Sequence, residues 1–153
     1  MNKAEIVAKI RDQLREQYDR MAGAAQTAHD YATDQDAKAE SKYDTRSLEA
    51  SYLAAGQAEK AEELAEALEV FADLQLPEFE DTDAIDVGAF IEADVEGELS
   101  YYLIAPRGGG VVCEHEGCDL TVLTPDSPLA KQLLGMRAGD NLDAPALTVF
   151  EVC

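Results

Sequence analysis

An apolar stripe that recurs along two long segments of the chain constrains the fold more than any other feature. Across residues 3–33 the apolar side chains follow one another at spacings of three and four, which places them on one face of an amphipathic helix. From Leu48 to Leu76 the same spacing returns with the order of size reversed, because small side chains come first and large ones last. The two segments therefore predict two long helices.

The reversed order of size predicts that these helices form an antiparallel hairpin with its turn at residues 40–46. In this arrangement the large side chains meet at one end, and they are Ile6, Ile10, Leu14, Leu68, Phe71 and Leu74. Alanines of both helices, such as Ala25, Ala55 and Ala58, would let the helices approach closely toward the turn. Each helix of about 30 residues would be about 45 Å long, so the hairpin would be a slender rod.

The chain changes character at Pro77, since proline cannot continue a helix. Residues 77–83 then predict an acidic linker, after which the apolar residues alternate with a period of two. Short β-branched and aromatic runs, separated by turn residues, predict an antiparallel meander. The expected strands are residues 87–95, 98–106, 110–117 and 118–125.

A short helix and a last pair of strands complete the expected fold. The segment 127–135 predicts a helix with Ser127 as its N-cap, Pro128 in its first turn and Gly135 as its C-cap. Two strands at 141–143 and 147–152 follow. The sequence thus predicts an α+β protein, whose parts are a helical hairpin (1–76), a linker (77–83) and a small antiparallel β-sheet domain with one short helix (84–153).

Acidic side chains dominate the composition and limit the class of partner. The net charge is −20 at pH 7, and residues 77–153 carry 16 acidic and 3 basic side chains. Such a surface repels phosphate backbones and anionic lipid, so we expect no binding to free DNA or to membranes and favour a basic protein surface as partner. Three cysteines without a secretory signal predict a cytoplasmic protein, which we expect to be a monomer.

The segment SPLAKQLLGMRAGD (127–140) resembles the Gre family of bacterial transcription elongation factors, with every anchor position of the family's motif present. Residues 85–104 are similar to the family's opening strands, and residues 51–68 are loosely similar to its second helix. The resemblance implies an FKBP-like C-terminal domain that docks on the rim of the RNA polymerase secondary channel. It also implies a coiled coil that runs down this channel toward the active site, where nascent RNA would be met only indirectly.

The resemblance implies two groups of residues that contact the core polymerase. They are Lys42, Tyr43 and Arg46 at the tip of the hairpin, and Ser127, Pro128, Leu129, Gly135, Gly139 and Asp140 in the C-terminal domain.

In Gre factors two acids at the tip help to hold a second Mg²⁺ and orient water for hydrolysis of backtracked RNA. When the family's tyrosine is matched to Tyr52, its two acids fall on Thr45 and Leu48 of this chain, and neither is acidic. Because Mg²⁺ demands near-octahedral geometry at about 2.1 Å, a displaced carboxylate is not equivalent. This departure leaves transcript cleavage open.

Carboxylates do occur near the expected positions. Asp44, Glu49 and Glu40 are the candidate catalytic residues, and Asp44 and Glu49 are candidate Mg²⁺ ligands within a polymerase complex. The protein would bring no cofactor of its own, and its Mg²⁺ would be shared with the polymerase active site. Three functions stay open: a regulatory contact in the channel, Mg²⁺-dependent stimulation of cleavage, and a coiled-coil adaptor or chaperone-like module that does not bind polymerase.

The run Cys113-Glu-His115-Glu-Gly-Cys118 allows two interpretations. Thiolates and imidazole are zinc ligands, but a structural zinc site needs four, and only Cys153 and the distant His29 could complete it. The alternative is a hairpin with a four-residue loop, whose flanking cysteines would face each other across the strands.

Overall fold

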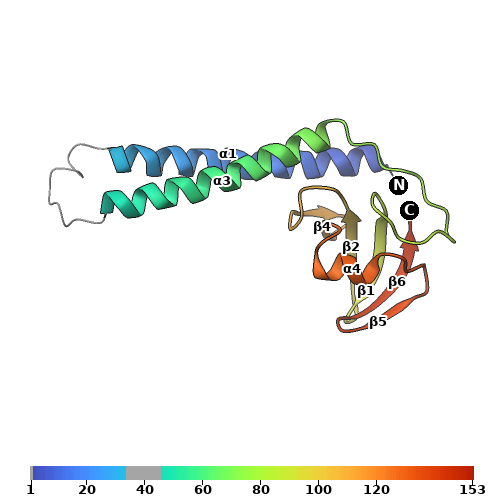
Figure 1. Cartoon of the computed structure of the whole chain (residues 1–153). Coiled ribbons are helices and arrows are strands. Elements are labelled where there is room, and N and C mark those ends of the chain that lie inside the picture. Colours follow the sequence, from blue (N-terminus) through green and yellow to red (C-terminus); the bar gives the residue numbers. More distant parts are fainter. Residues whose placement is uncertain (1, 34–45) are drawn as a thin grey trace. The chain divides into compact units, whose positions relative to one another are not determined.

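A computed structural model describes residues 2–33 and 46–153 of the chain (Figure 1). These residues form two compact units. We call Leu14–Ala67 the hairpin unit, and Met1–Gln13 together with Leu68–Cys153 the sheet unit. Within the described ranges, no helix combines the length and the apolar character needed to cross a membrane.

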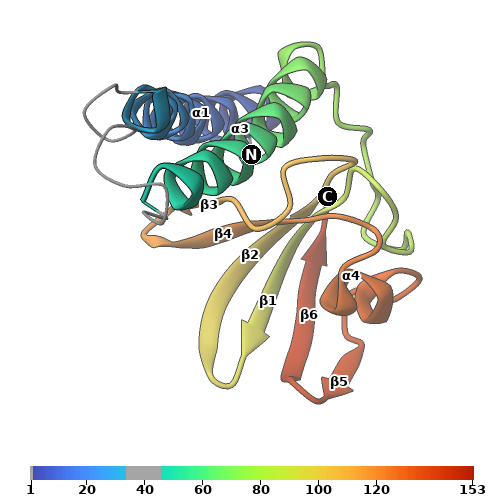
Figure 2. The same cartoon turned by 60° about the vertical axis from the view of Figure 1, so that its left-hand side comes forward.

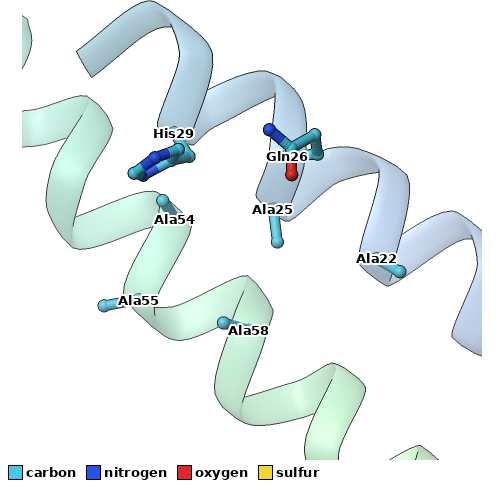
Figure 3. Close-up of a pocket in the computed structure, with 7 residues that line it drawn as sticks. All are labelled: Ala22, Ala25, Gln26, His29, Ala54, Ala55 and Ala58. Carbon is cyan, nitrogen blue, oxygen red and sulfur yellow. The ribbon is translucent and has the colours of Figure 1, made fainter. Parts of the chain in front are cut away.

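Two long helices, α1 (Lys3–Thr33) and α3 (Arg46–Ala72), confirm the predicted helical segments. In the hairpin unit the two helices lie side by side and run antiparallel (Figures 1 and 3). Leu14 of α1 and Leu64 of α3 are buried, as the apolar stripe predicts.

The alanine-rich part of the hairpin unit differs from the expectation. Ala55 and Ala58, which were expected to lie on the buried stripe, are exposed and line an open groove of about 440 Å³ between the helices. A methyl group is too short to fill the space that larger side chains such as Leu14 and Leu64 set between two helices. Close packing is therefore confined to the part of the stripe with large side chains.

The sheet unit contains one six-stranded sheet and one short helix, which makes the fold α+β (Figure 2). The strands are β1 (Phe90–Val95), β2 (Glu98–Ile104), β3 (Val112–His115), β4 (Cys118–Leu123), β5 (Asn141–Asp143) and β6 (Ala146–Val152), and the helix is α4 (Pro128–Leu133). Their order across the sheet is β3-β4-β2-β1-β6-β5.

The predicted antiparallel meander is wrong at one place, because β4 pairs with β2 in parallel. Residues 105–111 carry the chain past the edge of the sheet, so that β3 becomes an edge strand and β4 lies between β3 and β2. The difference in burial explains this order. Leu120 and Val122 of β4 are fully buried, whereas Val112 and Glu114 of β3 are exposed, so the more apolar strand takes the inner position.

The main core of the sheet unit lies between one face of the sheet and α4. Its buried residues are Ile85, Ala89, Ile91, Ala93, Ile104, Leu123, Ala130, Leu133, Leu147, Val149 and Val152. Phe79, in the acidic segment that follows α3, is half-buried and packs against this core. The Lys3 Nζ atom donates to the carbonyl oxygen of Pro77 at 2.6 Å and contacts Oε2 of Glu78 at 3.1 Å, so these interactions hold the same segment to the start of α1.

Candidate functional site

Most of the predicted tip residues lie outside the described residues. These are Glu40, Lys42, Tyr43 and Asp44. Arg46 and Glu49 lie in the first two turns of α3, where only the helical backbone is described. The proposed roles of the tip carboxylates, as catalytic groups or as Mg²⁺ ligands, stay predictions.

Ser127 caps α4 as the sequence predicts. Its backbone is extended (φ −66°, ψ 147°), and its Oγ accepts a hydrogen bond from the backbone N–H of Ala130 at 3.2 Å. The Ser127 carbonyl accepts from the N–H of Lys131 at 3.0 Å. Pro128 occupies the first turn, where its missing N–H costs no hydrogen bond.

One side of α4 is anchored and the other faces solvent. Ala130 and Leu133 are completely buried in the core, and Leu129 is half-buried against it. Pro128 and Lys131 are exposed. Among the predicted partner-binding residues of the C-terminal domain, Pro128 therefore presents an exposed apolar side chain.

The turn after α4 depends on two glycines in the left-handed region of φ. Leu134 is the C-cap, and Gly135 follows it with φ 87°, so the predicted C-cap is one residue too late. The Gly135 N–H donates to the carbonyl of Ile85 at 2.9 Å, and the Gly139 N–H (φ 90°) donates to the carbonyl of Val149 at 2.8 Å. Asp140 Oδ2 accepts from the Arg137 N–H at 2.8 Å. These contacts join the motif to the sheet.

Two basic residues lie beside the N-terminus of α4, and sequence reasoning missed them. A hydrogen bond from Thr124 lowers the pKa of the Asp126 carboxyl, and the positive charges of Lys131 and Arg107 lower it further. Lys131 and Arg107 are two of the three basic residues in 77–153. Because basic residues are so rare in this half, the sequence could have marked these two as candidates for a partner contact. The negative charge of Asp126 beside Pro128 is therefore partly offset.

The β3–β4 hairpin corrects the expected cysteine geometry. Its turn contains only Glu116 and Gly117, which both have positive φ (52° and 82°), so His115 pairs with Cys118 and Cys113 pairs with Leu120. The cysteines are thus offset along the strands and do not face each other directly. Both are free thiols.

The hairpin's polar groups do not form a metal centre. No group of three or more His, Cys, Asp or Glu side chains suited to a metal ion exists among residues 2–33 and 46–153. The His115 ring instead makes edge contacts with Phe90 (centroids 5.4 Å apart) and Tyr101 (4.9 Å). Its Nδ1 is buried without a hydrogen-bond partner in the described part of the chain. Burial raises the pKa of the Cys113 thiol, which opposes metal binding.

The groove of the hairpin unit is lined by alanine methyl groups of both helices together with two polar side chains of α1 (Figure 3). Its lining residues are Ala22, Ala25, Gln26 and His29 from α1 and Ala54, Ala55 and Ala58 from α3. Gln26 Nε2 donates to Asp30 Oδ1 at 2.8 Å. The groove therefore combines alanine methyl groups with the polar side chains of Gln26 and His29.

Solved structures similar to this chain include three GreA-factor homologues. The GreA factor homolog 1 (Gfh1) protein of Thermus thermophilus is 20% identical, with 94% of each chain covered and a TM-score of 0.38. Gfh1 of Thermus aquaticus is 20% identical, with 99% of this chain and 96% of that chain covered and a TM-score of 0.37. A structure of the transcription factor Gfh1 is 22% identical, with 94% and 93% covered and a TM-score of 0.38. The chain matches no protein-family model and no curated protein.

Proposed function

We propose that this protein is a cytoplasmic regulator of transcription elongation that binds RNA polymerase and acts through the secondary channel. The observation that carries the proposal is the segment 127–140, whose Gre-like motif coincides with a capped helix and a glycine turn built into the sheet. A long antiparallel helix pair in the same chain supports it, because a narrow pair of helices suits a deep pore.

The N-terminus of α4 is the proposed docking point on the polymerase. Pro128 is exposed there, and Lys131 and Arg107 offset the negative charge of Asp126. The buried Ala130 and Leu133 fix the helix to the core, so a partner would meet a surface that is already ordered. Gly135, Gly139 and Asp140 would act by holding this surface in place.

Regulation by occupancy of the channel fits the tip sequence better than transcript cleavage does. Thr45 and Leu48 stand where the family motif has acids, and Asp44 and Glu49 are displaced from that spacing. On α3, Glu49 lies about 100° around the helix axis from Leu48, which takes its carboxylate out of the near-octahedral arrangement that Mg²⁺ requires. We therefore propose a factor that has no activity of its own.

Two measurements test this function. The protein is first incubated with core RNA polymerase, and Pro128→Asp is compared with Val112→Asp, a control at a 42% exposed site of β3 that is not among the proposed docking residues. We expect Pro128→Asp to weaken binding about tenfold, because it replaces the exposed apolar ring of the docking surface with a charged group that binding would have to desolvate. Equal binding of both variants would remove α4 from the interface. An absence of wild-type binding at low salt would favour the adaptor alternative.

The second measurement separates occupancy from cleavage. Halted, backtracked complexes with Mg²⁺ are incubated with the wild type, Asp44→Ala or Glu49→Ala, and RNA length is followed. We expect altered elongation without shortening of the RNA. Shortening by the wild type that either variant abolishes would establish the cleavage function instead.

A further inference from the structure

Phe150 on β6 is a large aromatic side chain that the fold leaves in solvent. It is 52% exposed, while Val149 beside it is completely buried. The pairing of β6 with β1 shifts at this point, because Ala93 lies opposite Val149 and Glu92 lies opposite Glu151. Phe150 is therefore the extra residue of a β-bulge, a feature that commonly re-aims a side chain.

The bulge borders a hollow of about 450 Å³, which we call the Phe150 hollow. Its lining residues are Asp81, Ala138, Phe150, Glu151 and Val152. Their side chains combine an aromatic ring and two small apolar groups with two carboxylates. The hollow lies on the sheet unit. None of its lining residues is among the proposed docking residues Pro128, Lys131 and Arg107.

Phe150 and Glu151 are the exposed residues of β6 beside this hollow, whereas Val152 is buried. Strand β5 pairs with β6 only from Ala146 to Thr148, and the loop at Asp140 pairs with Val149 (Figure 2). Beyond Val149, in the part of the chain that the structure describes, β6 pairs only with β1 on its inner side. A partner would therefore contact this part of β6 through the Phe150 and Glu151 side chains.

The two carboxylates of the hollow favour a partner segment that carries positive charge. Asp81 and Glu151 are both exposed, and the only basic side chain close in sequence, Arg137, donates to the Thr82 carbonyl. An arginine or lysine can lay its aliphatic stem on an aromatic ring and direct its charge to nearby carboxylates. An acidic segment would place further negative charge beside these two carboxylates, which is unfavourable.

We propose that the Phe150 hollow binds a basic segment of a partner protein, with an arginine or lysine placed over the Phe150 ring. This inference goes beyond the proposed function, because it does not depend on binding to RNA polymerase. The second surface would let one molecule hold a basic protein segment while the N-terminus of α4 stays accessible.

The test uses the full-length, ¹⁵N-labelled protein and a short peptide in which arginine alternates with valine. A peptide with glutamate in place of arginine is the control ligand. We expect saturable binding of the arginine peptide, with amide shifts concentrated at Asp81, Ala138 and 150–152. Shifts spread evenly over the acidic surface, or equal binding of the glutamate peptide, would overturn the proposal.

Variants identify the side chains responsible. We expect Phe150→Ser to weaken binding of the arginine peptide about tenfold, as for loss of an aromatic anchor. Leu99→Ser is the matched control, because Leu99 is 38% exposed on β2 and does not line the hollow. Unchanged affinity of Phe150→Ser would refute the assignment. If that variant fails to fold, the double variant Asp81→Asn with Glu151→Gln carries the same test, with Glu98→Gln as its control.

Binding to core polymerase is measured on the same proteins, so that the two ideas can fail separately. A wild type that ignores polymerase but binds the arginine peptide at Phe150 supports this inference and overturns only the proposed function. A wild type that binds polymerase but not the peptide supports the proposed function and overturns this inference.

Discussion

Ser127 determines where α4 starts, because a six-residue helix has few other means of satisfying its first N–H groups. We predict that Ser127→Ala lowers the free energy of unfolding by about 1 kcal/mol, through loss of the hydrogen bond to the Ala130 N–H. Urea unfolding of the whole chain measures this change. Ser127→Asn keeps an N-cap acceptor and should be close to the wild type. Equal loss in both variants would show that the cap is not the cause.

The Cys153 thiol holds its proton more tightly than an ordinary thiol does. Burial raises the pKa of its thiol to about 11, and the hydrogen bond to Glu151 Oε1 (3.1 Å) and the charge of that carboxylate contribute to the rise. The folded protein thus holds this proton more tightly than the unfolded chain does. The contribution to stability is complete below the ordinary thiol pKa, and it is lost as pH rises through about 11.

Two measurements check this prediction. Alkylation of Cys153 between the ordinary thiol pKa and about 11 should be slower in the folded protein than in urea. Glu151→Gln should speed alkylation in the folded protein, because it removes the negative charge. Identical rates in wild type and variant would show that Glu151 does not influence the thiol.

At the scale of elements, two glycines with nearly the same φ allow the cost of backbone strain to be measured apart from the cost of a side-chain clash. Gly88 (φ 94°) and Gly97 (φ 92°) both lie in the left-handed region. A Cβ atom on Gly88 would lie 2.5 Å from Pro77 Cδ, whereas one on Gly97 would meet nothing within 4 Å. Gly88 therefore lets the segment after α3 pass close to the start of β1.

We predict that Gly97→Ala costs about 1 kcal/mol of stability through backbone strain alone, and that Gly88→Ala costs at least about 1 kcal/mol more through the clash with Pro77. Chemical denaturation of the two variants gives the difference. Equal costs would mean that the Pro77 segment moves aside freely.

The interior of α3 contains a glycine with no packing role. A Cβ at Gly56 would meet nothing within 4 Å. Gly56→Ala should therefore stabilise the helix by up to about 1 kcal/mol, which is the difference in helix propensity. The helical circular dichroism signal at increasing temperature measures the effect, with Ala58→Gly as the reverse change at an exposed site of the same helix. A lower melting temperature for Gly56→Ala would contradict the prediction.

At the scale of the whole molecule, the net charge of −20 acts on stability. Like charges repel more in the compact state than in the extended chain, and salt screens them over about 10 Å at 0.1 M. We predict that the urea midpoint rises as NaCl increases from about 0.02 to about 0.5 M. A midpoint that falls over this range would show that attractive ion pairs outweigh the repulsion.

Most of the elements could be predicted from the sequence, while their arrangement could be predicted only in part. The apolar period of residues 3–33 marks α1, and the Ser-Pro pair at 127–128 marks the start of α4, because both signals come from neighbouring residues. The parallel pairing of β2 with β4 could not be read from the same patterns. It depends on which strand buries more apolar surface, a comparison between residues far apart in the sequence.

The candidate site, too, could be predicted from the sequence only in part. The 127–140 motif could be found from its residues, but the positions of Lys131 and Arg107 around Asp126 required the folded sheet unit. The two-residue turn at Glu116 and Gly117 was also missed, since a left-handed glutamate is uncommon and the sequence favoured a longer loop.

The sequence by itself determined the helices, the change to a β-rich region at Pro77 and the cap of α4, because helical periodicity and capping act between residues a few positions apart. Only the tertiary structure decided the inner place of β4, the open groove beside Ala55 and the exposure of Phe150 on β6. These features follow from how remote segments share a limited amount of buried surface, and that balance is set only when the chain has folded.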